Sequence, residues 1–278
     1  MDITTYLSAL SGVGGRGVCR LSDLALTAEQ TERTQRLCPN AQAAAVVLFP
    51  YLVRDADTGR TLSRYACGRD YHAVIRDALA PLCAQLEADF PPHRFVPLAD
   101  ASPLPEVQCA VQSGAGFLGD NHLIFDRTYG SYVFIGTILT DAPLAPTAPS
   151  TESCPHCGAC RMACPLGALT KHGVDEALCL SALTQSKGTL NDRQTAALAR
   201  HPLIWGCDIC SDVCPLNRTA QETGLTDFRE GRITALSPEE LDGLTRRQFG
   251  ERYPDRAFTW RGPAPLVRNL KLRQSREK

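Results

Sequence analysis

Eight cysteines between residues 154 and 214 constrain this chain more than any other feature of its sequence. The first four have the spacing C-x2-C-x2-C-x3-C, the last three have C-x2-C-x3-C, and a proline directly follows each motif. One more cysteine stands between the two motifs. The first spacing is that of bacterial proteins with two iron–sulfur clusters, in which the last cysteine ligates the other cluster. The sequence therefore predicts a module that binds two [4Fe-4S] clusters and transfers electrons.

The spacing also predicts how the eight thiolates divide between the clusters. A C-x2-C-x2-C loop can wrap three corners of a cube, and the fourth thiolate comes from the cysteine before proline in the opposite motif. The second motif is one ligand short, because Ile204 stands three residues before Cys207, so Cys179 is the remaining candidate. The first cluster is expected to bind Cys154, Cys157, Cys160 and Cys214. The second is expected to bind Cys164, Cys179, Cys207 and Cys210.

Two alternatives to redox-active clusters remain open from the cysteines alone. Eight thiolates also suffice for two structural zinc sites, although zinc ribbons favour separated C-x2-C pairs. A pair of purely structural iron–sulfur clusters is the other alternative. Iron content distinguishes zinc from iron, and reduction by dithionite distinguishes idle clusters from active ones. The five remaining cysteines share no metal spacing and are expected to be small buried hydrophobes: Cys19, Cys38, Cys67, Cys83 and Cys109.

Composition and charge favour a globular protein of the cytoplasm. The 278 residues carry a formal net charge of −1, which indicates neither nucleic acid nor an anionic membrane as a partner. The opening residues lack the basic and apolar regions of a targeting signal, and the apolar runs are too short for a transmembrane helix. We expect a cytoplasmic monomer with no membrane association.

The order of apolar and polar residues predicts a mixture of helices and strands. Residues 1–40 are expected to be mainly helical, and short strands are expected over 43–51 and 95–98. Residues 70–90 have the apolar spacing of an amphipathic helix, in which Pro81 permits a kink or a break. Two β-rich runs within 114–140 predict a β-hairpin about a polar turn at 126–130. Near the end of the chain, Ser237 is expected to cap a helix.

Several stretches outside the cysteine motifs resemble one family, the cobalamin-dependent epoxyqueuosine reductases, which are themselves similar to reductive dehalogenases. The resemblance runs from about residue 43 to residue 270. The matching stretches are RYACGRDYH (64–72), DASPLPE (100–106), GAGFLG (114–119), GSYVFIG (130–136), CLSALT (179–184), GCDIC (206–210), WRG (260–262) and VRN (267–269).

The resemblance implies a fold, a reaction and partners. The fold is α+β, with a nitroreductase/dehalogenase-like corrin-binding domain over 1–146, a two-cluster ferredoxin-like domain over 147–218 and a C-terminal segment over 219–278 that packs on the core. The family reduces epoxyqueuosine to queuosine in the anticodon of tRNA. The clusters pass single electrons to cobalamin, and an electron donor such as ferredoxin or flavodoxin is expected to reduce the clusters.

The resemblance also implies roles for individual residues. Asp100 occupies the position of the family's catalytic aspartate in D-x-x-P-x-x-E and is expected to be the proton donor, with a pKa raised by an apolar corrin face. Taken alone, an aspartate before Ser-Pro is more often a turn or cap residue. The other residues expected to contact the cobalamin are Tyr71, Ile124, Ile135, Ile138, Thr184, Gln185, Ser186 and Asp208.

The chain departs from the family pattern in two places. The family usually has Gly-Lys-Asn after its glycine turn, and here Asp120 replaces the lysine. The chain is also expected to be a short form, without the helical-repeat domain that helps longer members to hold tRNA. A basic stretch could contact phosphates instead, or could simply be solvated: Arg261, Arg268, Lys271, Arg273, Arg276 and Lys278.

These departures keep other functions open. One alternative is a related corrinoid iron–sulfur reductase that acts on a small molecule. The other is an electron-transfer partner that catalyses no reaction of its own. Cobalamin binding distinguishes the reductases from a plain carrier, and turnover of epoxyqueuosine-containing tRNA distinguishes the two reductases.

Overall fold

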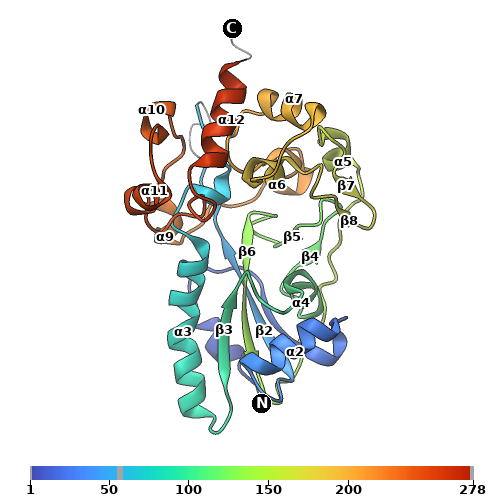
Figure 1. The fold of residues 1–278 in the computed structure, drawn as a ribbon. Helices are drawn as coiled ribbons and strands as arrows, with labels where there is room; N and C mark the ends of the chain where they lie inside the picture. Colours follow the sequence, from blue (N-terminus) through green and yellow to red (C-terminus); the bar gives the residue numbers. More distant parts are fainter. Residues whose placement is uncertain (1, 55–58, 276–278) are drawn as a thin grey trace.

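The fold is known from a computed structural model, which describes residues 2–54 and 59–275. It is α+β, as predicted: an antiparallel sheet forms one end of the molecule, and the cysteine motifs and the C-terminal helices form the other (Figure 1). Two residues of the basic stretch, Arg276 and Lys278, lie outside the described residues. Within the described ranges, no helix is both long and apolar enough to cross a membrane.

The central sheet has four strands in the order β1-β2-β6-β3. Their bounds are β1 Arg16–Arg20, β2 Ala43–Pro50, β6 Val133–Thr140 and β3 Phe95–Ala99. Successive residues of the fully buried β2 face opposite sides of the sheet, because strand side chains alternate between its two faces. Ala45, Val47 and Phe49 pack in one apolar cluster with helix α3 (Tyr71–Asp89), and Ala44, Val46 and Leu48 pack in another with α4 (Glu106–Gln112).

Three expectations for this region can be compared with the structure. Helix α3 is confirmed, and it continues through Pro81 without a break. The expected hairpin is wrong: Asp126 and Gly130 do form a bridge, but β6 pairs with β2 and β3 and not with the preceding run. The helical expectation for residues 1–40 missed strand β1, which pairs with β2 at the edge of the sheet.

The remaining elements of the sheet end are short helices and a two-stranded ribbon. The helices are α1 (Thr4–Ser8), η1 (Leu21–Asp23) and α2 (Ala28–Leu37). The short helix η2 (Arg64–Ala66) precedes α3 and packs with the C-terminal helices at the other end. The ribbon consists of β4 (Phe117–Leu118) and β5 (Ile124–Phe125). It places residues 119–125 between the sheet and the cysteine motifs (Figure 1).

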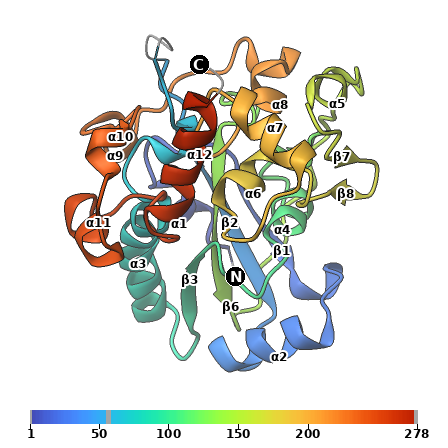
Figure 2. The same cartoon turned by 45° about the horizontal axis from the view of Figure 1, so that its top comes forward.

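The cysteine motifs lie among short elements at the other end of the molecule. These are α5 (Ala159–Ala163), β7 (Leu169–Thr170), β8 (Gly173–Val174), α6 (Leu180–Gln185), α7 (Asp192–Arg200), α8 (Ile209–Asp212) and η3 (Pro215–Asn217). The C-terminal helices α9 (Thr226–Arg229), α10 (Pro238–Leu241), α11 (Arg246–Arg252) and α12 (Ala264–Gln274) lie beside them, and α12 packs against α6 and α7 (Figure 2).

The C-terminal helices are anchored by a cluster of apolar side chains from three parts of the chain. Leu62 and Ala66 come from the segment before α3, Ile204 and Trp205 precede the second cysteine motif, and Phe249 and Phe258 come from the C-terminal part. The helix cap predicted at Ser237 is confirmed, with Glu240 completing a capping box. This cluster fixes the second cysteine motif relative to the sheet.

Candidate active site

A large cavity separates the upper end of the sheet from the cysteine motifs. It has a volume of about 400 Å³ and opens to solvent. Its sheet-side wall is apolar, and it is formed by Leu123, Ile124, Val133, Phe134 and Ile135. The opposite wall contains Leu169, Leu180 and four cysteines. A flat apolar ligand would lie between a hydrophobic wall and a row of thiols.

The eight motif cysteines fall into two groups of four. Cys164, Cys179, Cys207 and Cys210 line the large cavity. Cys154, Cys157, Cys160 and Cys214 line a second, smaller one. All eight are free of disulfides. Burial raises the pKa of Cys207 and Cys210 to about 12, so these thiols are neutral at pH 7 unless a cation stabilises their thiolates.

The five other cysteines, Cys19, Cys38, Cys67, Cys83 and Cys109, are buried in the apolar interior, as predicted.

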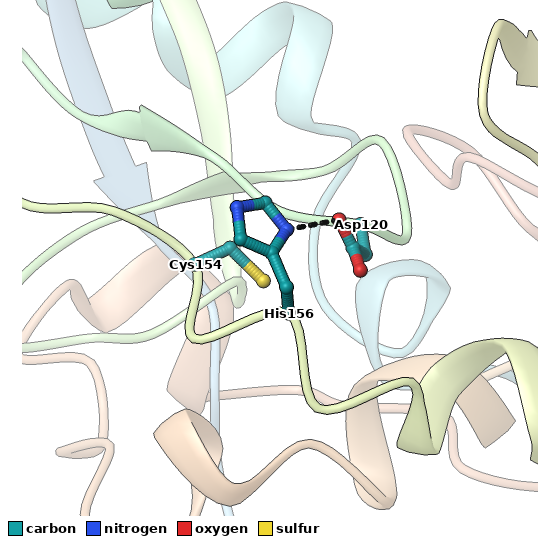
Figure 3. A group of neighbouring side chains, drawn as sticks. All are labelled: Asp120, Cys154 and His156. Carbon is teal, nitrogen blue, oxygen red and sulfur yellow. Dashed lines mark hydrogen bonds and ion pairs between the residues drawn. The ribbon is translucent and has the colours of Figure 1, made fainter.

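An acid and a histidine lie beside the smaller cavity. Asp120 lines this cavity, and its Oδ1 lies 2.8 Å from Nδ1 of His156 (Figure 3). Arg161 lies 3.9 Å from the same oxygen. Asp120 and His156 each place one ligand atom within 4.8 Å of the Cys154 sulfur. Asp120 stands where the resemblance leads us to expect a lysine, so this chain places an acidic side chain, with His156 and Arg161 as neighbours, next to the first group of cysteines.

Asp208, between two cysteines of the second group, is the centre of a buried polar network. Its carboxylate accepts hydrogen bonds from Nη1 of Arg60 (2.5 Å), from the hydroxyl of Ser63 (2.5 Å) and from the backbone N–H of Arg64 (3.1 Å). The Arg60 and Asp208 side chains are only 10% and 8% exposed. The network connects the loop before α3 to the cysteine wall, and Asp208 itself lines the cavity.

Asp100 lies at the upper end of the sheet, where β3 ends. The last residue of β3, Ala99, pairs with Gly136 of β6, next to the cavity residue Ile135. Asp100 has a φ of +50° and Ala101 a φ of +39°, a conformation that L-residues rarely adopt. The ring of Tyr71 stacks on Phe134, a cavity residue, at 4.3 Å, and its hydroxyl donates to Asp100 Oδ2 at 2.5 Å. These contacts link Asp100, which does not itself line the cavity, to the cavity residue Phe134.

The charge state of Asp100 differs from the expectation. Hydrogen bonding from His72 and Tyr71 holds the pKa of Asp100 well below its usual range, so the expected raised pKa is wrong for this structure. His72 Nε2 lies 3.3 Å from Asp100 Oδ2, and its Nδ1 lies 2.7 Å from Asp70 Oδ1. These two carboxylates raise the pKa of His72 to about 9. At neutral pH the proton of this pair is therefore on the imidazole.

A second carboxyl group lies behind Asp100. Burial, and then the charge of Asp100, raise the pKa of Glu106 to about 8. Its Oε1 is buried and has no hydrogen-bond partner among the described residues. Glu106 is therefore protonated at neutral pH.

The other expected cobalamin contacts fall in different places. Ile124, Ile135 and Asp208 line the cavity. Ile138 is fully buried in the cluster around α3, because it is three residues from Ile135 and so faces the other side of the sheet. Its side chain cannot reach the cavity.

The segment over 184–186 faces the C-terminal part of the chain. The hydroxyl of Thr184, which is fully buried, accepts from Gly206 N–H. The Gln185 side chain donates a hydrogen bond to the Tyr65 hydroxyl and accepts one from the indole N–H of Trp260. The carbonyl of Ser186 accepts a hydrogen bond from Arg268. This segment supports the cavity wall from behind.

Sequence reasoning did not assign roles to His72, Glu106 or Trp260. A signal existed for all three, since His72 ends the RYACGRDYH stretch, Glu106 ends D-x-x-P-x-x-E and Trp260 begins the WRG stretch. His122, which also lines the cavity, has its Nε2 2.7 Å from the carbonyl oxygen of Thr170, so that nitrogen is a donor in this structure.

Two family models match the chain. Residues 32–101 match "Epoxyqueuosine reductase QueG, DUF1730", and residues 153–217 match "4Fe-4S double cluster binding domain". The epoxyqueuosine reductase of Listeria monocytogenes is 32% identical over 83% of this chain and 62% of its own length. That of Pseudomonas aeruginosa is 35% identical over 74% of this chain and 60% of its own length.

The chain belongs to the epoxyqueuosine reductase family. It spans about three-fifths of the length of these relatives. A crystal structure of epoxyqueuosine reductase with an epoxyqueuosine-modified tRNA-Tyr stem loop has a TM-score of 0.82 at 26% identity, over 98% of this chain and 80% of that one. A catabolic reductive dehalogenase has a TM-score of 0.50 at 13% identity, over 94% of this chain and 34% of that one, which is a likeness in fold.

The residues of this epoxyqueuosine reductase family member fit the cofactors that its motifs imply. The double-cluster domain covers all eight motif cysteines, and each group of four lines one cavity. The chain therefore has the donors for two [4Fe-4S] clusters. The apolar wall opposite the second group fits the flat face of a macrocycle, within reach of the second cluster site.

Proposed function

We propose that this protein reduces epoxyqueuosine to queuosine in tRNA, using two [4Fe-4S] clusters and cobalamin. The observation that carries the proposal is the large cavity, where one cysteine group forms a wall and Tyr71 connects Asp100 to the cavity residue Phe134. Removal of an epoxide oxygen to give an alkene and water consumes two electrons and two protons. The chain has groups suited to supply both.

The proposed electron path follows the two groups of cysteines. The first cluster would be held by Cys154, Cys157, Cys160 and Cys214, and the second by Cys164, Cys179, Cys207 and Cys210. Cys157 is exposed, so the first cluster is the one open to an external donor such as ferredoxin or flavodoxin. The second faces the cavity, where a bound cobalamin would supply a cobalt centre able to accept single electrons and act on the epoxide.

Contacts to cobalamin are proposed for residues that line or support the cavity. Ile124, Ile135 and Asp208 would contact the ring directly. Tyr71 would not contact the ring itself but would hold Phe134, the cavity residue on which it stacks. Thr184, Gln185 and Ser186 would support the cavity wall from behind.

The proposed acid is the pair of His72 and Asp100. His72 is protonated at neutral pH and shares a hydrogen bond with Asp100 Oδ2. As the departing oxygen gains negative charge beside Asp100, the proton held by His72 can pass to the Asp100 carboxylate and from it to that oxygen. Asp100 is then the group that gives the proton to the substrate, and His72 is the source of that proton.

The tRNA substrate is favoured over a small molecule by the family relationship and by the mouth of the cavity, which is open to solvent. A protein acting on tRNA would work in the cytoplasm, and we propose a monomer there. The segments 1–146, 147–218 and 219–278 remain the proposed division of the chain.

The test is turnover of tRNA that contains epoxyqueuosine by anaerobically reconstituted protein, with nucleosides identified by mass spectrometry. Asp100→Asn should bind cobalamin as the parent does and lose at least about a hundred-fold in turnover, since general acid catalysis contributes about 10²–10⁴-fold. Full activity of Asp100→Asn removes Asp100 from its role. A parent protein that binds cobalamin but leaves epoxyqueuosine-tRNA unchanged favours the small-molecule reductase instead.

A further inference from the structure

Trp260 is unusual among the large apolar side chains of this protein because it is open to solvent. It is 53% exposed, whereas Trp205, the other tryptophan, is fully buried. An exposed tryptophan adds apolar surface that water disfavours, so a position that keeps one often binds something there.

The ring of Trp260 is held in a fixed orientation. Its indole N–H donates to Gln185 Oε1 at 3.3 Å, and Arg246 donates to its backbone carbonyl at 3.1 Å. The guanidinium of Arg261 lies 3.8 Å from the centre of the ring, in cation–π contact. An indole fixed at its edge and in contact with a cation presents a rigid aromatic surface, which a freely rotating side chain would not.

A hydrogen-bond chain connects this ring to the cavity. Gln185, the partner of the indole, also donates to the hydroxyl of Tyr65 at 3.2 Å, and Tyr65 lines the cavity. Trp260 is thus two hydrogen bonds from the wall that contains Cys179 and Asp208. A ligand on the ring would be adjacent to whatever occupies the cavity.

The surroundings of Trp260 carry positive charge. Arg246 and Arg261 contact the tryptophan itself, Arg268 donates to the carbonyl of Ser186, and Lys187 follows in the chain as an exposed residue. Cations beside an exposed aromatic ring are what a single-stranded nucleic acid requires, because phosphates pair with the cations and a base stacks on the ring.

From these observations we propose that Trp260 and Arg261 form a stacking platform for an unpaired nucleobase of the RNA strand that delivers the substrate to the cavity. This inference rests on the proposed function, because it takes RNA as the occupant. It assigns the platform one base, stacked on the open part of the indole, with the adjoining phosphates on the neighbouring arginines.

The experiment measures binding of a labelled anticodon stem-loop to the holoprotein by fluorescence anisotropy. Trp260→Ala should raise the dissociation constant about ten-fold, because stacking of a base on an aromatic side chain is typically worth between about five-fold and a hundred-fold. Trp260→Phe keeps an aromatic ring and should raise it less than about three-fold. Met162→Ala removes an apolar side chain of α5 that is even more exposed (80%) and serves as the control, with no change expected.

The salt dependence of stem-loop binding and the tryptophan fluorescence of the protein give two further readouts. Trp260→Ala should leave the slope of log K against log salt unchanged, whereas Arg261→Ala should reduce it by about one phosphate contact. The stem-loop should change the tryptophan emission of the parent, and this change should disappear in Trp260→Phe, since Trp205 is buried.

The outcomes separate this inference from the proposed function. If the parent binds the stem-loop and Trp260→Ala binds it equally well, the platform is wrong while the RNA substrate stands. If the parent binds no stem-loop at all, both the platform and the tRNA substrate are wrong.

Discussion

Replacing Glu106 with glutamine should make the protein more stable, increasingly so as the pH rises. Glu106 has a pKa of about 8 in the folded protein, raised by burial from an ordinary value of 4.5. Between these two values the folded state holds a proton that the unfolded state releases. The free energy of unfolding therefore falls as pH rises through this window, by about 1.4 kcal/mol per pH unit. At pH 7 the accumulated loss is about 3 kcal/mol.

Glutamine has the shape of a protonated glutamate and does not ionise. The difference in free energy of unfolding between Glu106→Gln and the parent should increase by about 3–4 kcal/mol from pH 5 to pH 8. The measurement is urea unfolding of anaerobic holoprotein followed by circular dichroism at several pH values. The test is how this difference in the free energy of unfolding changes with pH. The new amide group can add a constant to the difference, but that constant does not depend on pH.

The matched control is Glu230→Gln, which changes an exposed glutamate just after α9. It should show no comparable trend. If the difference between Glu106→Gln and the parent is constant between pH 5 and pH 8, Glu106 is ionised in the folded protein and the reasoning about its burial fails.

Three other perturbations test the rest of the site. Cys179→Ala should lose the second cluster and retain the first, so iron content should fall by half; loss of all iron or of none contradicts the assignment. Asp208→Ala removes the carboxylate that pairs with the buried Arg60, so it should lower the free energy of unfolding by about 3–5 kcal/mol in urea titrations. A change below about 1 kcal/mol would exclude a structural role for Asp208. Turnover should fall as pH rises through about 9, where His72 loses its proton, and His72→Gln should remove that limb of the pH profile. The same raised pKa means that the His72 contribution to stability is present below about pH 6.5 and lost through about pH 9.

Local sequence patterns were sufficient for part of this fold. The spacing of the cysteines is set by the geometry of one cluster loop, and the two groups of four lie in separate cavities in the arrangement that the spacing predicts. The apolar face of α3 was also predictable, because residues such as Ile75 and Leu79 recur at helical spacing. Pro81 did not break the helix, since the surrounding apolar side chains are buried in the core on both sides of it.

Non-local contacts account for what the sequence did not reveal. Strand β6 follows a turn that suggests a hairpin, but it pairs with β2, about ninety residues earlier, and takes the centre of the sheet. The charge of Asp100 depends on His72 and Tyr71, which come from the start of α3 and are remote in sequence. The family resemblance placed Ile138 among the cobalamin contacts, but only the register of β6 determines which face each side chain occupies.

The central claim is that a corrinoid binds in the cavity next to the second cluster. The most direct measurement is the ratio of cobalt to iron in protein reconstituted anaerobically with iron, sulfide and cobalamin and then freed of unbound cofactor. We predict one cobalt for two complete clusters, and loss of the cobalt alone when Ile135 is replaced by arginine in the cavity wall. Protein that holds both clusters and takes up no cobalt contradicts the account.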